Sequence, residues 1–488
     1  MGACMTVIPG GSRMPLDTFF NSLSLCFSFP LFSLNRNRSV FKFSVTQFNI
    51  SQAPDSRKKI SNMSGKPTVA FAGLGAMGGG MAKNLVKEGF SVTGYDVYQP
   101  LVDSFVEAGG KPSKTPKELA EGADFLVSMV ANSAQNEGLL FDGPDAAIHG
   151  LGKGKTFILC STCPPHWLAE LRKKFDEEFN RPDVKVLDCP VSGGTIRAGN
   201  GTLSIFAAGP DADLDNAKEV LECMSANLYR MGELGQGTNT KTIHQLLAAT
   251  NIATASEALG LAATAGLNTK DVVEHVNKSD GASFMFENRT AHMLKNDWTP
   301  LSALAIIHKD TVIVTDAARK NQFPVAMANT AEQIYWAGIN AGMLRDDDAK
   351  TVQLFLPKSQ GDLVAKCVDA DANMSSNHGI SKDTIVDLLN GIHLASSVEG
   401  MAFCQKLGID EKVMCEIISK AAGWSAIYTK YIPGMLEKKV WSLSACNEAE
   451  QIRSKLAAAV EKCIAMKFPC PMAAMALQQF HLAEVANK

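Results

Sequence analysis

A glycine-rich turn between a short apolar run and a helical pattern is the feature that most restricts how this chain can fold. The apolar run is Thr68–Ala72, the turn reads Gly73-Leu-Gly-Ala-Met-Gly78, and helical spacing follows over Met77–Glu88. A second apolar run, Ser91–Tyr95, completes a βαβ pattern. In that setting GxGxxG spacing predicts a dinucleotide site: the glycines allow a tight turn, close approach of a pyrophosphate and packing of helix on strand. The predicted cofactor-binding residues of this turn are Gly73, Leu74, Gly75, Ala76, Met77 and Gly78.

Asp96 follows the second apolar run about 20 residues after the turn, where a carboxylate accepts hydrogen bonds from the adenosine ribose. The next four residues, Val97-Tyr-Gln-Pro100, include no basic side chain that could pair with the 2′-phosphate of NADP. Asp96 therefore predicts NAD as the cofactor and disfavours NADP. The alternative interpretation is an aspartate that only shapes the turn.

Further strand-like runs alternate with helical stretches as far as residue 230. They lie at residues 125–130, 156–160, 184–187 and 203–207. This alternation predicts a doubly wound, mostly parallel sheet, so that residues 66–230 form a Rossmann-like α/β domain. Val130 and Thr162 lie at predicted strand ends above the cofactor crevice, and we predict that they contact the nicotinamide.

Beyond residue 230 the pattern is helix and turn. Residues 240–267 predict one long, largely buried helix. We predict an all-α domain over 231–356 and a second one over 379–488. The acidic run Asp346–Asp348 and the polar stretch 369–379 mark the linker between them, which we place at 357–378.

The second helical domain repeats landmarks of the first in the same order. Leu388-Leu389, Glu399, Gly408, Gly423, Ser425 and Phe468-Pro469 echo Leu246-Leu247, Glu257, Gly266, Gly281, Ser283 and Phe323-Pro324. Two alanine-rich helical stretches can resemble each other by chance, but glycine and Phe-Pro landmarks in order favour a duplication.

Three segments carry recognisable motifs: the glycine-rich turn with Met81-Ala-Lys-Asn-Leu85, the segment Asp188-Cys-Pro-Val-Ser-Gly-Gly194, and Gly235-Gln-Gly-Thr-Asn-Thr-Lys241. They resemble the β-hydroxyacid dehydrogenases, the family of 3-hydroxyisobutyrate and 6-phosphogluconate dehydrogenases. The resemblance covers roughly residues 66–355 and departs at Cys189, where alanine is usual. It implies oxidation of a small hydroxy acid with a nicotinamide cofactor, or the reverse reduction.

Ser192, Gly193 and Gly194 follow a predicted strand and offer a hydroxyl and open backbone N–H groups, which suit a substrate carboxylate. From spacing alone an ordinary glycine-rich turn is an equal alternative, and the resemblance favours substrate binding. Lys241 is the candidate for the group that takes the hydroxyl proton, on the first turn of the long helix. To act as a base its pKa must fall from about 10.4 towards about 7 or 8 through burial. The alternative is a solvated lysine at a helix start.

His244 and Gln245 lie three and four residues after Lys241, hence on the same helix face. 3-Hydroxyisobutyrate dehydrogenases carry asparagine at these positions. The run Lys241–Gln245, with Ser283–Arg289 and Asp346–Asp348, instead resembles L-threonate 2-dehydrogenases. This predicts a polyhydroxylated acid as substrate, with Gln245 binding it and His244 as a second catalytic residue. For His244, a hydrogen-bonded histidine without a role in proton transfer is an equal alternative.

Lys309 and Asp310 match a family pair that is expected to reach the cofactor across the domain cleft, whereas a surface ion pair is the alternative. In the second helical copy Asp383 takes the place of Lys241, so that copy cannot repeat the chemistry. We expect it to replace or extend a subunit contact, with the protein a homo-oligomer.

Composition excludes several other classes of protein. The 47 basic residues are scattered among 50 acidic ones, which disfavours a nucleic-acid partner. Twelve cysteines lack regular spacing, and the single CxxC at Cys160–Cys163 has no second pair, so we predict neither disulfides nor a metal site.

The first 62 residues are basic and rich in Ser and Phe. They resemble a mitochondrial transit peptide; alternatively, Met63 is the true start, which we favour together with a cytoplasmic location. The apolar stretch 19–34 is short and interrupted, which disfavours a membrane span. Two alternative functions remain: a 3-hydroxyisobutyrate-like dehydrogenase or semialdehyde reductase, and a non-catalytic NAD-binding regulator or scaffold. Retention of Lys241 and Ser192 argues against the second.

Overall fold

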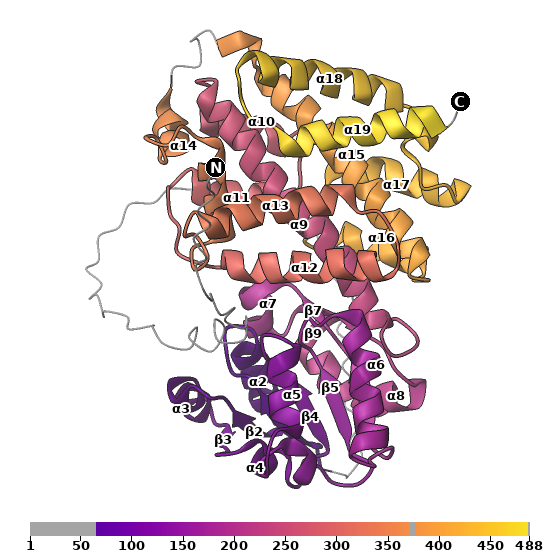
Figure 1. Cartoon of the computed structure of the whole chain (residues 1–488). Coiled ribbons are helices and arrows are strands. Elements are labelled where there is room, and N and C mark those ends of the chain that lie inside the picture. The colour runs from indigo at the N-terminus through magenta and orange to yellow at the C-terminus, as the bar shows by residue number, and fades with distance from the viewer. Residues whose placement is uncertain (1–64, 371–376, 487–488) are drawn as a thin grey trace, which may run out of the picture. The chain divides into compact units, whose positions relative to one another are not determined.

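The computed structural model describes residues 65–370 and 377–486 (Figure 1). The predicted transit peptide and the alternative start at Met63 lie outside the described residues.

A six-stranded parallel sheet forms the core of the N-terminal part, in the order β3-β2-β1-β4-β5-β6. Its strands are β1 (Thr68–Ala72), β2 (Ser91–Tyr95), β3 (Lys111–Pro112), β4 (Phe125–Ser128), β5 (Thr156–Leu159) and β6 (Lys185–Asp188). Because both faces are covered by helices, the central strands β1, β4 and β5 are mostly apolar. The order reverses between β1 and β4, which is where this fold binds ligands, outside the carboxyl ends of the strands. The predicted doubly wound parallel sheet is confirmed.

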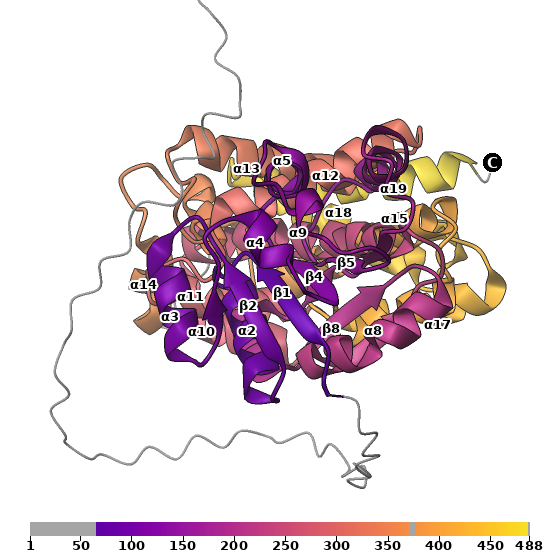
Figure 2. The same ribbon diagram turned by 90° about the horizontal axis from the view of Figure 1, so that it is seen from below.

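Helices cover the two faces of this sheet (Figure 2). The helices are α2 (Gly78–Lys87), α3 (Gln99–Glu107), α4 (Pro116–Ala120), α5 (Ser133–Phe141), α6 (Pro165–Lys173) and α8 (Asp211–Met224), with short turns η1 (Ala147–His149) and η2 (Lys174–Glu178). Val69 and Phe71 of β1 pack with α2, α3 and α8, whereas Ala70 and Ala72 pack with α4, α5 and α6. Side chains alternate between the faces as strand geometry requires.

A second, three-stranded sheet holds β7 (Val191–Ser192), β8 (Leu203–Ala207) and β9 (Ser225–Arg230), with α7 (Gly194–Asn200) between β7 and β8. The prediction that residues 203–207 belong to the main sheet is therefore wrong. The chain reverses after β6, and Ala208, just after β8, forms an isolated antiparallel bridge with Asp188 at the end of β6. An apolar run shows that a strand forms, but not which sheet it joins.

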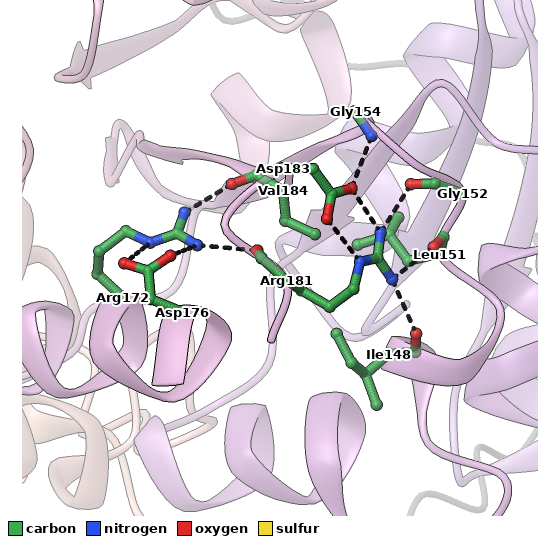
Figure 3. Close-up of polar contacts among 9 residues, drawn as sticks. All are labelled: Ile148, Leu151, Gly152, Gly154, Arg172, Asp176, Arg181, Asp183 and Val184. Carbon is green, nitrogen blue, oxygen red and sulfur yellow. Dashed lines mark hydrogen bonds and ion pairs between the residues drawn. The ribbon is translucent and has the colours of Figure 1, made fainter. Parts of the chain in front are cut away.

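Two arginines fasten the segment that leads into β6 (Figure 3). Arg181 donates to the carbonyl oxygens of Leu151 and Gly152, at 2.9 and 3.0 Å, and pairs with Asp183. The guanidinium group lowers the pKa of the Asp183 carboxyl well below its usual range. Arg172 donates to the carbonyl oxygen of Val184 at 2.6 Å. These bonds hold the start of β6, the strand that ends at the candidate site.

Helix α9 (Gln236–Thr264) is the centre of the helical part. It is long and apolar enough to cross a membrane by length and composition alone, but its apolar stretch is entirely buried inside the protein. The remaining helices are α10 (Thr269–Asn277), α11 (Phe284–Met293), α12 (Leu304–Lys320), α13 (Ala326–Asn340), α14 (Leu363–Lys366), α15 (Lys382–Lys406), α16 (Glu411–Ser419), α17 (Ala426–Lys438), α18 (Ala449–Ala465) and α19 (Pro471–Ala486), with short turns η3 (Asp348–Phe355), η4 (Cys367–Asp369), η5 (Asn377–Gly379) and η6 (Leu443–Ala445).

The two helical segments contact each other through two glutamates, Glu257 and Glu399, that occupy equivalent positions in the repeat. Helices α9 and α15 pack against each other (Figure 1). Glu399 of α15 accepts hydrogen bonds from the N–H groups of Met327 and Ala328, at the start of α13. In return, Glu257 of α9 accepts from two N–H groups at the start of α19. A carboxylate at a helix N-terminus satisfies its unpaired donors, so each segment caps a helix of the other.

The acidic run Asp346–Asp348, which the sequence places at the edge of a linker, is folded into the core instead. Asp348 is buried and takes two hydrogen bonds from the guanidinium group of Arg289, at 2.5 and 2.9 Å. Asp347 accepts from the N–H groups of Leu301 and Ser302. Within the predicted linker, α14 also packs on α9. A charge-rich segment signals exposure only when its charges have no partners elsewhere in the chain.

Candidate active site

The glycine-rich turn has the backbone that the GxGxxG pattern requires. Gly73 has φ +87°, and a Cβ atom there would lie 2.5 Å from the carbonyl oxygen of Met129. A Cβ atom on Gly78 would lie 1.9 Å from the carbonyl oxygen of Gly73. Around Gly75, in contrast, no atom lies within 4 Å of the Cβ position. The turn therefore packs tightly against the protein at Gly73 and Gly78 and leaves free space at Gly75, where a pyrophosphate could approach the backbone.

Asp96 folds back over this turn. Its Oδ2 accepts from the N–H of Leu74 at 2.8 Å, and its Oδ1 accepts from the N–H of Tyr98 at 2.9 Å. Asp96 therefore does shape the turn, as the alternative interpretation holds. Each carboxylate oxygen can accept a further bond, so the turn does not exclude ribose binding.

Thr162 and Lys309 lie where the two parts of the protein meet, and Val130 lies beside the glycine-rich turn. The N atom of Val130 is 3.1 Å from the Cβ position of Gly73, so Val130 is adjacent to the glycine-rich turn. Lys309, on α12, donates to the carbonyl oxygen of Thr162 at 3.2 Å. Helix α12 thus reaches from the helical part to the loop after β5, beside the predicted cofactor crevice.

The start of α9 is anchored to the end of β6 by Asp188. This buried carboxylate accepts from the backbone N–H and the hydroxyl of Thr238, at 2.7 and 2.6 Å. Burial raises the pKa of Asp188 to about 7. A Cβ atom on Gly237 would lie 2.4 Å from the carbonyl oxygen of Phe206, so only glycine lets the helix approach this closely. This role of Asp188 is not among the predictions from the sequence; its signal is an aspartate at the end of an apolar strand.

Lys241 lies on the second turn of α9, because the helix begins at Gln236 and not near residue 240 as predicted. Its side chain is nearly buried, with 7% exposed. Burial lowers the pKa of Lys241 to about 8, with a further lowering from Lys309 and an opposing contribution from Asp310. The structure thus supplies the shift that a lysine base requires.

Ser192, His244, Gln245 and Asp310 form one chain of hydrogen bonds. Ser192 Oγ lies 3.0 Å from His244 Nε2, and His244 Nδ1 lies 2.8 Å from Gln245 Oε1. Gln245 Nε2 donates to Asp310 Oδ2, while Lys309 Nζ lies 2.8 Å from Asp310 Oδ1. The structure therefore brings predicted residues from β7, α9 and α12 together.

Gly193 and Gly194 continue from Ser192 with φ +140° and +70°, a backbone that favours glycine. A Cβ atom on Gly193 would lie 2.8 Å from Arg197 Cδ, whereas nothing lies within 4 Å of that position on Gly194. Gly194 lies two residues after Ser192, whose hydroxyl lies 3.0 Å from His244 Nε2. This arrangement fits the predicted carboxylate site.

Comparisons with known proteins agree with this architecture. A sequence model described as the NAD binding domain of 6-phosphogluconate dehydrogenase matches residues 68–232. Another, described as the NAD-binding of NADP-dependent 3-hydroxyisobutyrate dehydrogenase, matches residues 235–355 and also 382–488. The same model thus matches both helical segments.

The chain is 36% identical to L-threonate dehydrogenase of Cupriavidus necator over 288 residues, 59% of this chain and 95% of that protein. It is 30% identical to mitochondrial 3-hydroxyisobutyrate dehydrogenase of Mus musculus, over 60% of this chain and 88% of that protein. A crystal structure titled 3-hydroxyisobutyrate dehydrogenase from Salmonella typhimurium is 34% identical, with a TM-score of 0.55 over 59% of this chain and 100% of that one.

The 6-phosphogluconate dehydrogenase of Plasmodium falciparum has a TM-score of 0.63 over 86% of this chain and 92% of that one. At 15% identity it shows the fold alone. The chain belongs to the β-hydroxyacid dehydrogenase family, a family of oxidoreductases that bind a nicotinamide cofactor.

Proposed function

We propose that this protein is an NAD-dependent dehydrogenase that oxidises a small polyhydroxylated acid, similar to L-threonate, to the corresponding oxo acid. The observation that carries the proposal is the buried Lys241, whose pKa of about 8 makes it a base near neutral pH, close to the Ser192–His244 pair. The 36% identity to an L-threonate dehydrogenase supports the choice of substrate.

In the proposed reaction Lys241 Nζ, in its neutral form, takes the proton of the substrate hydroxyl group as the carbonyl group forms. NAD held along the glycine-rich turn would supply the acceptor for the hydride from the same carbon. In the reverse direction, protonated Lys241 returns the proton to the carbonyl oxygen. Asp310 and Lys309 have opposite effects on the pKa of Lys241, which keeps it close to the value set by burial.

The substrate carboxylate is proposed to bind at Ser192, Gly193 and Gly194. A hydroxyl group and open backbone N–H groups are suitable donors for a carboxylate, and the open space beside Gly194 supports this placement. The cofactor is proposed to bind along the glycine-rich turn with Asp96 at its ribose. Asp96 supports NAD over NADP because a carboxylate repels a 2′-phosphate.

A second candidate is a 3-hydroxyisobutyrate-like dehydrogenase or a semialdehyde reductase that uses the same residues. The 30% identity to the mouse enzyme favours it. A non-catalytic regulator is disfavoured because an unpaired lysine is rarely buried without a function.

A substrate panel tests the proposal. The full chain is incubated with NAD or NADP and with L-threonate, 3-hydroxyisobutyrate or 6-phosphogluconate, and NAD(P)H formation is followed. We expect L-threonate with NAD to have the highest kcat/KM. A preference for 3-hydroxyisobutyrate would favour the second candidate, and equal efficiency with both cofactors would contradict the role of Asp96.

We also propose a cytoplasmic location, as the similarity to bacterial dehydrogenases favours. A fluorescent protein fused after residues 1–62 would enter mitochondria only if the transit-peptide alternative is correct.

A further inference from the structure

The side-chain amide of Gln245 lies between a carboxylate and an imidazole and can take only one orientation. Its Nε2 donates to Asp310 Oδ2, and its Oε1 lies 2.8 Å from His244 Nδ1. Asp310 forms an ion pair with Lys309, and an ionised carboxylate only accepts hydrogen bonds. The NH₂ group must therefore face Asp310, and the carbonyl oxygen must face the imidazole.

This orientation determines where His244 carries its hydrogen. A carbonyl oxygen only accepts, so His244 Nδ1 must carry the hydrogen that Gln245 binds. Burial and the nearby charge of Lys241 lower the pKa of His244 to about 3, so the imidazole is neutral and has a single N–H. Its Nε2 therefore has a free lone pair, and the hydroxyl of Ser192, 3.0 Å away, donates to it.

We propose that Gln245 and Asp310 are positioning residues that hold His244 in the Nδ1–H form, so that its Nε2 accepts a hydrogen bond from a second hydroxyl group of the substrate. This inference rests on the proposed function and specifies it further. L-Threonate carries hydroxyl groups besides the one that is oxidised, whereas 3-hydroxyisobutyrate carries a methyl group and no second hydroxyl. The hydrogen-bond chain is thus a device for selecting polyhydroxylated acids.

The Ser192 hydroxyl links this selection to carboxylate binding. It has one hydrogen, and while it donates to His244 Nε2 it cannot donate to a substrate carboxylate. A substrate hydroxyl that donates to Nε2 releases the hydrogen of Ser192 for the carboxylate. With a substrate that lacks that hydroxyl, His244 Nε2 and the substrate carboxylate compete for the single hydrogen of the Ser192 hydroxyl. One hydrogen bond of about 1.4 kcal/mol corresponds to roughly tenfold in specificity.

The first test reads the form of the His244 ring directly by ¹⁵N NMR of the full chain without substrate, with the signal assigned by its loss in His244→Asn. In the wild type we expect a protonated Nδ1 and an unprotonated Nε2. In Gln245→Leu the acceptor for Nδ1 is absent, so the hydrogen should move to Nε2 and bond to Ser192 Oγ. A wild-type signal with the hydrogen on Nε2, or a Gln245→Leu signal that does not change, would overturn the proposal.

Two further variants keep this test decisive. Asp310→Asn changes the far end of the hydrogen-bond chain from Ser192 and leaves the residues of α9 unchanged. An asparagine can offer the Gln245 amide either a donor or an acceptor. We expect both ring forms in this variant, and a pure Nδ1–H form would count against the proposal. Asp387→Leu is the matched control: residue 387 is the counterpart of 245 in the second helical copy. It should leave the His244 signal unchanged.

The second test compares kcat/KM for L-threonate and 3-hydroxyisobutyrate with NAD. In Gln245→Leu we expect the ratio between the two substrates to fall about tenfold, whereas Asp387→Leu should keep the wild-type ratio. An equal loss on both substrates would refute the selection of a second hydroxyl. If the wild type oxidises neither acid, the proposed function fails, and the NMR result alone still decides whether Gln245 positions His244.

Discussion

The two helical copies share a scaffold but place the same helix face in different surroundings. In the first copy, α9 runs against the end of the main sheet, and Lys241 on this face is 7% exposed. In the second copy, α15 presents Asp383 at the position of Lys241, and 83% of that side chain is exposed. Burial that lowers the pKa of a lysine is thus present in one copy only.

Residue 245 in the first copy and its counterpart 387 in the second also differ in burial. Gln245 in the first copy is buried and donates to Asp310. Its counterpart Asp387 forms an ion pair of 3.3 Å with Lys455, and both side chains are partly exposed to solvent. The helical scaffold alone therefore does not provide the buried surroundings of the candidate site. The covering sheet supplies the low-dielectric surroundings that shift pKa values and strengthen hydrogen bonds.

The largest expected difference between the copies is catalytic. Lys241→Ala removes the proposed base and should lower kcat for L-threonate oxidation by about 10²- to 10⁴-fold. Lys455→Ala, a lysine change in the second copy, where Asp383 takes the place of Lys241, should leave kcat unchanged. Steady-state kinetics of both variants, with circular dichroism to verify folding, makes the measurement. A comparable loss in Lys455→Ala would mean that the second copy is not chemically silent.

The pH profile should report the burial of Lys241. Oxidation needs the neutral amine, so kcat/KM should rise about tenfold per pH unit below a pKa of about 8 and level off above it. Reduction of the oxo acid needs the protonated amine and should fall above the same pH. Profiles in both directions over pH 6–10 make the comparison. An oxidation rate that is flat from pH 6 to 9 would exclude Lys241 as the base.

The reciprocal helix caps, in contrast, should behave alike in both copies. Burial raises the pKa of Glu257 to about 8 and that of Glu399 to about 7, above their values in the unfolded chain. The stability of the protonated forms is therefore present below about pH 4.5 and is lost as pH rises towards 7 or 8. In Glu257→Gln and Glu399→Gln the NH₂ group cannot accept from a helix N–H, so each variant loses one of the two accepted bonds at every pH. Because glutamine does not ionise, the stability of each variant relative to the wild type should still increase by about 1 to 3 kcal/mol as pH rises over this range.

Thermal melts of the wild type and both glutamine variants at pH 5 and pH 8.5 would measure this change. The Tm of each variant relative to that of the wild type should be higher at pH 8.5 than at pH 5. An effect confined to Glu257→Gln would mean that the two caps are not equivalent and would break the symmetry between the copies.

The smallest effect is expected at the exposed pair of the second copy. Because solvent screens Asp387 and Lys455, a double-mutant cycle of Asp387→Ala and Lys455→Ala should give a coupling below about 1 kcal/mol. Urea unfolding of the two single variants and the double variant measures it. A coupling of several kcal/mol would contradict the weak interaction expected for a pair exposed to solvent.

The sequence predicted much of the fold because its signals are local. The glycine-rich turn, the strands on either side of α2 and the long helix α9 are set by patterns within a few residues, and the structure confirms them. The boundary of α9 was placed about four residues late, and β8 was placed in the wrong sheet. Both errors depend on contacts with distant segments, which a local pattern does not contain.

The candidate site also combines features that local sequence spacing predicts with features that depend on distant contacts. That Lys241, His244 and Gln245 share one helix face follows from helical spacing. Their surroundings do not: the bonds from Thr238 to Asp188 and from Gln245 to Asp310 join residues 50 and 65 positions apart. The acidic run Asp346–Asp348 predicts the edge of a linker, but Asp348 is buried because it pairs with Arg289 on the distant helix α11.

By itself the sequence determined the dinucleotide turn, the order of strands and helices, the repeat of the helical segment and the residue types available for chemistry. Only the tertiary structure decided that Lys241 is buried, that Gln245 faces Asp310 with its NH₂ group, and that Glu257 and Glu399 cap helices of the other copy. The physical reason is that turn and helix geometry depend on neighbours along the chain. Desolvation and hydrogen-bond direction depend on whichever groups the fold brings within a few ångströms.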